Sequence, residues 1–138
     1  MVGDAEAMAR LSTELGYAAD TAVMAKRIEA VLASSADFLV VAIASSDEIC
    51  GFLQAHASTV IESGFRVEIM GLIVAGSARR QAVGRALVAD AEQWAKNLSA
   101  PVMVVRSNIV RMESHQFYPA LRYEATKTQQ IYRKRLRD

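Results

Sequence analysis

Apolar residues recur at helical spacing in two segments near the start of the chain. Asp4 and Asp20 are residue types that cap helix starts, and each precedes one of these segments. The apolar positions that share a helix face are Met8, Leu11 and Leu15 in the first segment and Met24, Ile28 and Val31 in the second. Gly16 stands where the first helix would end. The pattern therefore predicts two amphipathic helices.

A strand-like pattern follows the second helix. Two short apolar, β-rich runs, about 38–43 and 49–56, flank the turn-forming sequence Ser-Ser-Asp-Glu at 45–48. Ser63 and Gly64 mark another turn before a longer apolar run over residues 65–75. These segments predict an antiparallel meander.

The clearest helical stripe comes next, with apolar residues at Val83, Leu87, Ala91, Trp94 and Leu98. The sequence PVMVVRS, from residue 101, then reads as a short buried strand. A strand–helix–strand unit over roughly 65–106 implies a parallel pair of strands joined by a crossover helix. A further helix is expected over 111–119, and partial alternation over about 122–136 predicts one or two final strands.

These elements place the chain in the α/β or α+β class. We expect a mixed, mainly antiparallel sheet flanked by helices, with the parallel strand–helix–strand unit at its centre. The length of 138 residues suits a single domain, residues 1–138, and the 52% apolar content is enough to build a core.

Composition narrows the function. The net charge of +1 argues against a general nucleic-acid binder. The absence of an 18-residue apolar run argues against a membrane span, and the first residues do not resemble a signal peptide. The single cysteine, Cys50, fits a reducing cytoplasm, and no Cys/His cluster has metal-site spacing. We therefore expect a cytoplasmic protein without a metal site.

Three arginines crowd the start of the central helix, in GSARRQAVGRAL at residues 76–87. Helix starts favour anions, so Arg79, Arg80 and Arg85 lie at the unfavourable pole unless a bound anion offsets their charge. Gly84 would let the oxygens of such an anion approach the backbone. The alternative is that the arginines are simply solvated. Neither a Walker loop nor a G-x-G-x-x-G sequence is present.

Residues 79–84, Arg-Arg-Gln-Ala-Val-Gly, resemble the acyl-CoA-binding motif of the GNAT superfamily of N-acetyltransferases. That motif has Gln or Arg, two variable residues, Gly, one variable residue and then Gly or Ala. Ala82 stands where the family usually has its first glycine. Because alanine is small, we expect a slightly tighter loop there.

A later segment, SNIVRMESHQFYPALRY, also resembles the family. In that segment of GNAT proteins, a small residue and a Phe-Tyr pair precede Gly-Phe or Gly-Tyr. The residues in the corresponding places are Ser114, Phe117, Tyr118 and Tyr123, with Arg122 where glycine is usual. The likeness covers about residues 4–136, although only three residues precede Asp4, where the family has its first strand. A missing strand would leave a sheet edge unpaired and favour a homodimer.

The resemblance implies acetyl-CoA as the co-substrate. Its pyrophosphate would lie at the helix start, against the residues Arg79, Arg80, Gln81, Ala82, Val83, Gly84, Arg85 and Ala86. Its pantetheine arm would bind the backbone of Leu72, Ile73 and Val74. Asn108 and Ser114 would complete this set, although Asn108 is equally typical of a turn.

The resemblance also implies two catalytic side chains. Tyr118 matches the family tyrosine that protonates the departing thiolate, and the alternative is a half-buried tyrosine whose hydroxyl is satisfied. Glu68 lies where several family members have their general base. Strand alternation predicts that Glu68 faces opposite Val67 and Ile69, on the same side as Leu72. The alternatives are a salt bridge to Arg66 or a neighbour, with water taking the proton.

The function implied is direct transfer of an acetyl group to a primary amine, without an acyl-enzyme. The late segment resembles that of aminoglycoside acetyltransferases, so the acceptor could be a small cationic amine of that kind, and a protein amine stays open. One alternative is a non-catalytic acyl-CoA-binding module that serves regulation or dimerisation. Another is a protein–protein adaptor with no ligand.

Overall fold

The structure is a computed structural model that describes residues 4–14, 20–76, 82–107 and 112–137, with the side chains of 112–115 left out. It divides into two compact units, Met1–Arg106 and Ser107–Asp138. The first unit contains, in order, α1 (Ala5–Glu14), α2 (Thr21–Leu32), β1 (Asp37–Ile43), β2 (Ile49–Val60), β3 (Gly64–Val74), α3 (Val83–Asn97) and β4 (Met103–Val105). The second contains α4 (Met112–Ala120).

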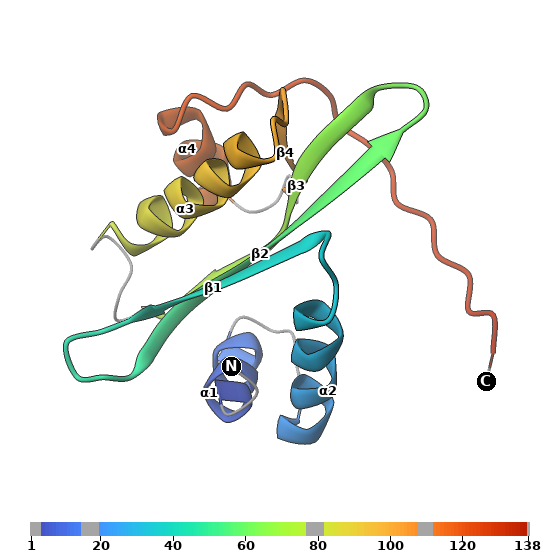
Figure 1. Cartoon of the computed structure of the whole chain (residues 1–138). Helices are drawn as coiled ribbons and strands as arrows, with labels where there is room; N and C mark the ends of the chain where they lie inside the picture. Colours follow the sequence, from blue (N-terminus) through green and yellow to red (C-terminus); the bar gives the residue numbers. More distant parts are fainter. Residues whose placement is uncertain (1–3, 15–19, 77–81, 108–111, 138) are drawn as a thin grey trace. The chain divides into compact units, whose positions relative to one another are not determined.

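The four strands form one mixed sheet in the order β1-β2-β3-β4 (Figure 1). β1 with β2 and β2 with β3 are antiparallel, whereas β3 and β4 are parallel and are joined through α3. The hairpin turn predicted at 45–48 is present, and the amide of Ala44 donates to the carbonyl of Glu48 at 2.8 Å. The predicted meander and parallel crossover unit are therefore confirmed.

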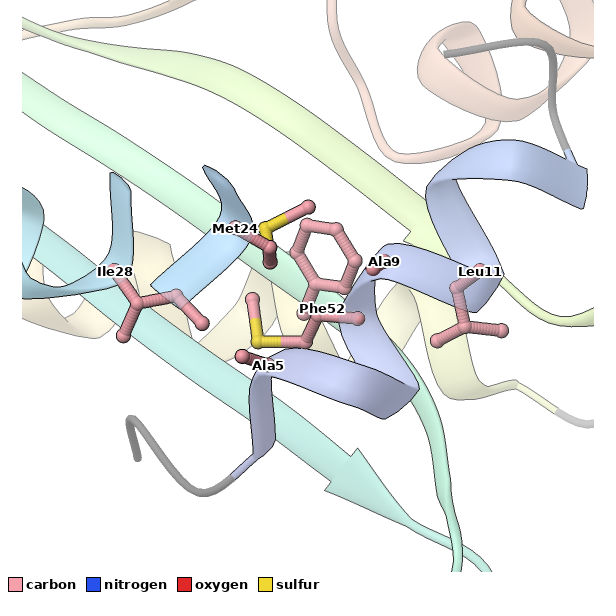
Figure 2. Close-up of a cluster of buried hydrophobic side chains, with 7 residues drawn as sticks. Ala5, Ala9, Leu11, Met24, Ile28 and Phe52 are labelled. Carbon is pink, nitrogen blue, oxygen red and sulfur yellow. The ribbon is translucent and has the colours of Figure 1, made fainter. Parts of the chain in front are cut away.

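α1 and α2 cover one face of the sheet over β1 and β2 (Figure 1). The predicted cap of α2 is present, because the Asp20 carboxylate accepts from the amide of Val23 at 2.8 Å. Figure 2 shows the Phe52 ring of β2 between side chains that the two helices contribute. The buried members of this cluster are Ala5, Met8, Ala9, Leu11, Met24, Ile28 and Phe52. Burial of these apolar side chains fixes both helices on the sheet.

α3 packs on the opposite face (Figure 1). Its fully buried stripe is Leu87, Val88, Ala91 and Ala95. Trp94 stacks on Phe38 of β1, with the ring centroids 5.3 Å apart. Leu98, the last residue of the predicted stripe, is 41% exposed because the helix ends one residue before it.

A bulge interrupts β3. Ala55 pairs with Ile69 but Gln54 pairs with Gly71, so Met70 is an extra residue that β2 does not match. The bulge reverses the alternation, and Leu72 therefore faces the same side as Ile69 rather than the side of Glu68. The expectation that Glu68 and Leu72 share a face is wrong for this reason.

The C-terminal segment differs from its prediction. Residues 123–137 contain no strand, so the one or two final strands expected over about 122–136 are absent from the described chain. Alternation marks a suitable side-chain pattern, but a strand also needs a neighbouring backbone with which to pair. Ile131, Tyr132 and Leu136 in this segment are 80–90% exposed. Among the described residues, no helix is long and apolar enough to cross a membrane.

Candidate active site

The residue at the N-cap of α3 provides no side-chain cap. Ala82, the N-cap residue, has φ 63° and ψ 13°, and its methyl side chain cannot accept a hydrogen bond from the first turn. The first amides of a helix lack intrahelical acceptors, so those at the start of α3 are available to a ligand. Val83 and Gly84 are half-buried, whereas Arg85 and Ala86 are exposed. Arg79, Arg80 and Gln81, predicted for the same site, lie outside the described residues.

Two contacts position this helix start. A β-carbon added to Gly51 of β2 would lie 3.0 Å from the carbonyl oxygen of Ile73 and 3.3–3.4 Å from Leu87 and Val83. Gly51 thus lets the first turns of α3 approach the sheet closely. The Glu14 carboxylate at the end of α1 accepts from the amide of Gly76 at 3.0 Å, immediately before the segment that leads to α3. Neither residue was singled out from the sequence, because their roles depend on contacts between distant elements.

The strands β3 and β4 pair over only three residues. Their register ends with Ile69 opposite Val105, whereas β3 continues to Val74. Leu72, Ile73 and Val74 are therefore beyond the described ladder on the β4 side. Their side chains are half-buried, and Ile73 packs against the core under α1 and α2. The segment predicted to bind the pantetheine arm thus has backbone groups on that side that β4 does not use.

Glu68 is an ion-paired carboxylate. Its Oε1 lies 3.4 Å from Nη2 of Arg66, and its Oε2 lies 2.5 Å from Nη1 of Arg106. The Glu68 side chain is 11% exposed. The salt bridge to Arg66, one of the alternatives read from the sequence, is present. Arg106 was missed, although its place two residues beyond Val104, the β4 partner of Glu68, puts both side chains on one face.

A second polar group lies beside Glu68 on the same face of the sheet. Nδ1 of His56 lies 3.1 Å from Oδ1 of Asp37, and Nε2 of Gln54 donates to the same oxygen at 3.1 Å. Burial raises the pKa of Asp37, but hydrogen bonds from Ser34, Gln54 and His56 outweigh it and lower the pKa below its ordinary value. No local pattern in the sequence predicts this group, because its members come from two strands that only the register brings together.

Tyr118 lies in the second unit, on α4. It is half-buried and makes edge-to-face contacts with Phe117 and Tyr123, with ring centroids 5.0 and 5.8 Å apart. Arg122 has φ 70°, the left-handed conformation that explains why the family usually has glycine at this position. Asn108 and the side chain of Ser114 lie outside the described part of the structure.

Cys50, the single cysteine, is buried on β2. No group of three or more His, Cys, Asp or Glu side chains gathers in the described part of the chain as a metal site would require.

Comparison with known proteins agrees with this architecture. The aminoglycoside N-acetyltransferase AAC(6')-Iy in complex with CoA superposes with a TM-score of 0.85 at 23% identity, over 96% of this chain and 90% of its own. AAC(6')-Ih from Acinetobacter baumannii gives 0.84 at 16% identity, over 99% and 95%. A transcriptional regulator from Bacillus halodurans gives 0.84 at 22%, over 96% and 94%. At these identities the likeness shows the fold.

The curated proteins contain no match to the chain. The model of the acetyltransferase (GNAT) family, in contrast, matches residues 6–121, most of the sequence. That match includes the meander, the bulged strand, the uncapped start of α3 and the Phe-Tyr pair of α4. The chain belongs to the GNAT family of acetyltransferases.

Proposed function

We propose that this protein transfers the acetyl group of acetyl-CoA directly to a primary amine. The observation that carries the proposal is the start of α3, where Ala82, in the left-handed conformation, stands at the N-cap and offers the first amides no side-chain acceptor. Such a helix start binds phosphate through its amides and its dipole. Structures of similar fold were solved with CoA, which supports the same ligand.

The residues of the first unit fit that ligand. The amides of Val83, Gly84 and Arg85 would meet the diphosphate, since that of Ala86 already donates to the carbonyl of Ala82. Ala86 would contact the ligand beside them, and the guanidinium of Arg85, exposed on the first turn, would add a charge-assisted hydrogen bond. Arg79, Arg80 and Gln81 precede this turn in the sequence. The two arginines would add to the same positive field, and Gln81 would add an uncharged amide donor. The backbone of Leu72 to Val74, beyond the ladder with β4, would bind the pantetheine arm as an added strand does.

Transfer requires the amine to lose a proton and the thiolate to gain one. Tyr118 is the proposed donor to the thiolate, because a phenol can protonate a thiolate near neutral pH. Glu68 would act on the amine side, where its carboxylate orients an ammonium group or receives a proton directly or through water. Asn108 and Ser114 are proposed to contact the pantetheine arm.

The acceptor is proposed to be a small cationic amine. Asp37 and Glu68, on one face of the sheet, would attract such a group. Neighbours that act on aminoglycosides favour an amine of that class, and a protein amine is the second possibility. We place the protein in the cytoplasm, which agrees with its single, unpaired cysteine.

A non-catalytic acyl-CoA-binding module is the rival function. One observation favours it, because both oxygens of Glu68 already contact guanidinium groups. Glu68 would have to give up one of these contacts before a carboxylate oxygen could meet a substrate amine.

Acetyl-CoA consumption by the purified protein, measured with neamine, spermidine and a lysine-containing peptide as acceptors, separates the two. The transferase predicts turnover with at least one amine and a fall of about 10²-fold or more in Tyr118→Phe. Glu68→Gln tests the carboxylate in the same assay. CoA binding without turnover on any amine would establish the rival, and the lack of any thermal shift with CoA would reject both in favour of an adaptor.

We also propose that the protein forms a homodimer through its C-terminal segment. Residues 123–137 carry the exposed side chains of Ile131, Tyr132 and Leu136 on a backbone without strand pairing, and β4 is an edge strand of the described sheet. Pairing with a second copy would cover these side chains and satisfy the free backbone groups. Sedimentation analysis should show a dimer that Ile131→Asp with Leu136→Asp converts to a monomer. A monomeric parent protein would contradict the proposal.

A further inference from the structure

A row of polar side chains crosses three strands in register. Asp37 of β1 is opposite His56 of β2, and His56 is opposite Glu68 of β3. Alternation along β1 and β2 puts this row on the face that carries Leu39 and Phe52, the face covered elsewhere by α1 and α2. Side chains directly opposite on one face have β-carbons about 4.5–5.5 Å apart, so the β-carbon of His56 lies between those of Asp37 and Glu68.

The contact between Asp37 and His56 fixes the imidazole ring. The Asp37 side chain is 11% exposed and accepts from Gln54 and from Nδ1 of His56. An ionised carboxylate can only accept, so Nδ1 of a neutral His56 carries the proton and Nε2 presents a lone pair. The His56 side chain is 40% exposed, and the described part of the chain supplies no partner for Nε2.

Glu68 and His56 differ in how many of their side-chain polar atoms are already in contact with other side chains. Arg66 and Arg106 take one carboxylate oxygen each, whereas the imidazole has one nitrogen anchored and the other open. All three groups in the row can accept a proton, but the Asp37 and Glu68 side chains are each 11% exposed and hold other side chains, so His56 has the accessible lone pair. The charged groups that face it are Asp37 on β1, Glu68 and Arg66 on β3 and Arg106 beyond β4.

The row lies next to the end of the ladder between β3 and β4. The ladder ends at Ile69, one residue beyond Glu68, and the bulge at Met70 follows. In the proposed function the thioester would lie beyond the end of this ladder. His56, directly opposite Glu68, is therefore one strand away from that point, on the face that α3 does not fill.

We propose that His56 is the proton acceptor for the amine, with Asp37 as the residue that orients its ring; this role rests on the proposed function. Nε2 takes a proton from the substrate ammonium. The neutral nitrogen then bonds to the thioester carbonyl carbon, and the carbon–sulfur bond breaks. The departing thiolate receives a proton, the new amide keeps one hydrogen, and His56 releases its proton to water. Glu68, whose oxygens contact Arg66 and Arg106, is then a positioning residue that fixes the β3 side of the row beside His56.

The test is the pH dependence of kcat/KM for an amine that the parent protein acetylates. The parent should show an ascending limb as the imidazole loses its proton. His56→Gln should lower kcat/KM by about 10²-fold or more and abolish that limb, and added imidazole should restore part of the rate of His56→Ala. Asp37→Asn should lower kcat with little change in KM, because it removes the carboxylate that orients the ring and leaves the base itself in place. His115→Gln, which removes the other histidine, is the matched control and should leave the profile unchanged.

CoA titration calorimetry on each variant separates loss of the base from loss of the fold. His56→Gln that binds CoA like the parent but turns over slowly supports the proposal. A His56→Gln protein with an unaltered pH profile and a rate within twofold of the parent would overturn the role of His56 and leave the transferase function standing. A parent protein that binds CoA but acetylates none of the amines would overturn the function and this role together.

Discussion

Ala82 has an unfavourable backbone conformation at the N-cap of α3, next to the proposed diphosphate site. Its left-handed φ of 63° costs an alanine about 1–2 kcal/mol, and glycine adopts it freely at some cost in unfolded-chain entropy. Ala82→Gly should therefore stabilise the protein by about 0.5–1 kcal/mol, measured by chemical denaturation. Ala89→Gly, at an exposed position inside the same helix, should destabilise it by a similar amount. Equal effects of the two substitutions would show that the conformation of Ala82 has no energetic consequence.

The ionisation of Asp37 makes the stability of the fold depend on pH. Because its folded-state pKa lies below the ordinary value of 3.8, its carboxylate stabilises the fold above that pH, and this contribution is lost as the pH falls through the lower folded pKa. Asp37→Asn should thus be less stable than the parent at pH 6, and the difference should shrink below about pH 4. Urea denaturation at pH 6 and below about pH 4 measures this difference in stability, with Asp90→Asn, at an exposed position, as the control. A difference that grows as the pH falls would contradict the predicted pH dependence.

At the scale of elements, the close packing of α3 on β2 sets where the helix starts. A methyl group at Gly51 would meet a backbone oxygen at 3.0 Å, which cannot move without disturbing β3. Gly51→Ala should destabilise the protein by roughly 1–3 kcal/mol and weaken CoA binding, because the first turn of α3 must shift. Gly71→Ala is the matched control, since its added carbon has no neighbour within 4 Å. Equal thermal midpoints in both variants would argue against this packing role.

The helices and strands of the first unit followed from local signals. Asp20 caps α2 as its residue type predicts, and the stripe of α3 packs on the sheet. The bulge at Met70 carries no such signal, because it depends on how two strands align. The row of Asp37, His56 and Glu68 depends on register across three strands and could not be read from spacing along one. The prediction of C-terminal strands was wrong, because alternating side chains do not provide a neighbouring strand with which the backbone can pair.

For the whole molecule, the proposed active site draws on residues that are far apart in sequence. Glu14 ends α1 and binds the amide of Gly76, so the first helix supports the segment that enters α3. The row of Asp37, His56 and Glu68 lies on one face of the sheet, and α3 lies on the other. The fold thus separates a proposed diphosphate site from a proposed acceptor site, with the ends of β3 and β4 between them.

The central claim is that the start of α3 binds the diphosphate of CoA, and calorimetric titration of CoA tests it most directly. Gly84→Glu places a negative side chain among the amides that would meet the diphosphate, whereas Ala89→Glu adds the same charge at an exposed position farther along the helix. We predict that the dissociation constant rises at least about tenfold in Gly84→Glu, equivalent to about 1.4 kcal/mol, and changes less than about twofold in Ala89→Glu. Equal affinities in the two variants, or a parent protein that does not bind CoA, would contradict the account.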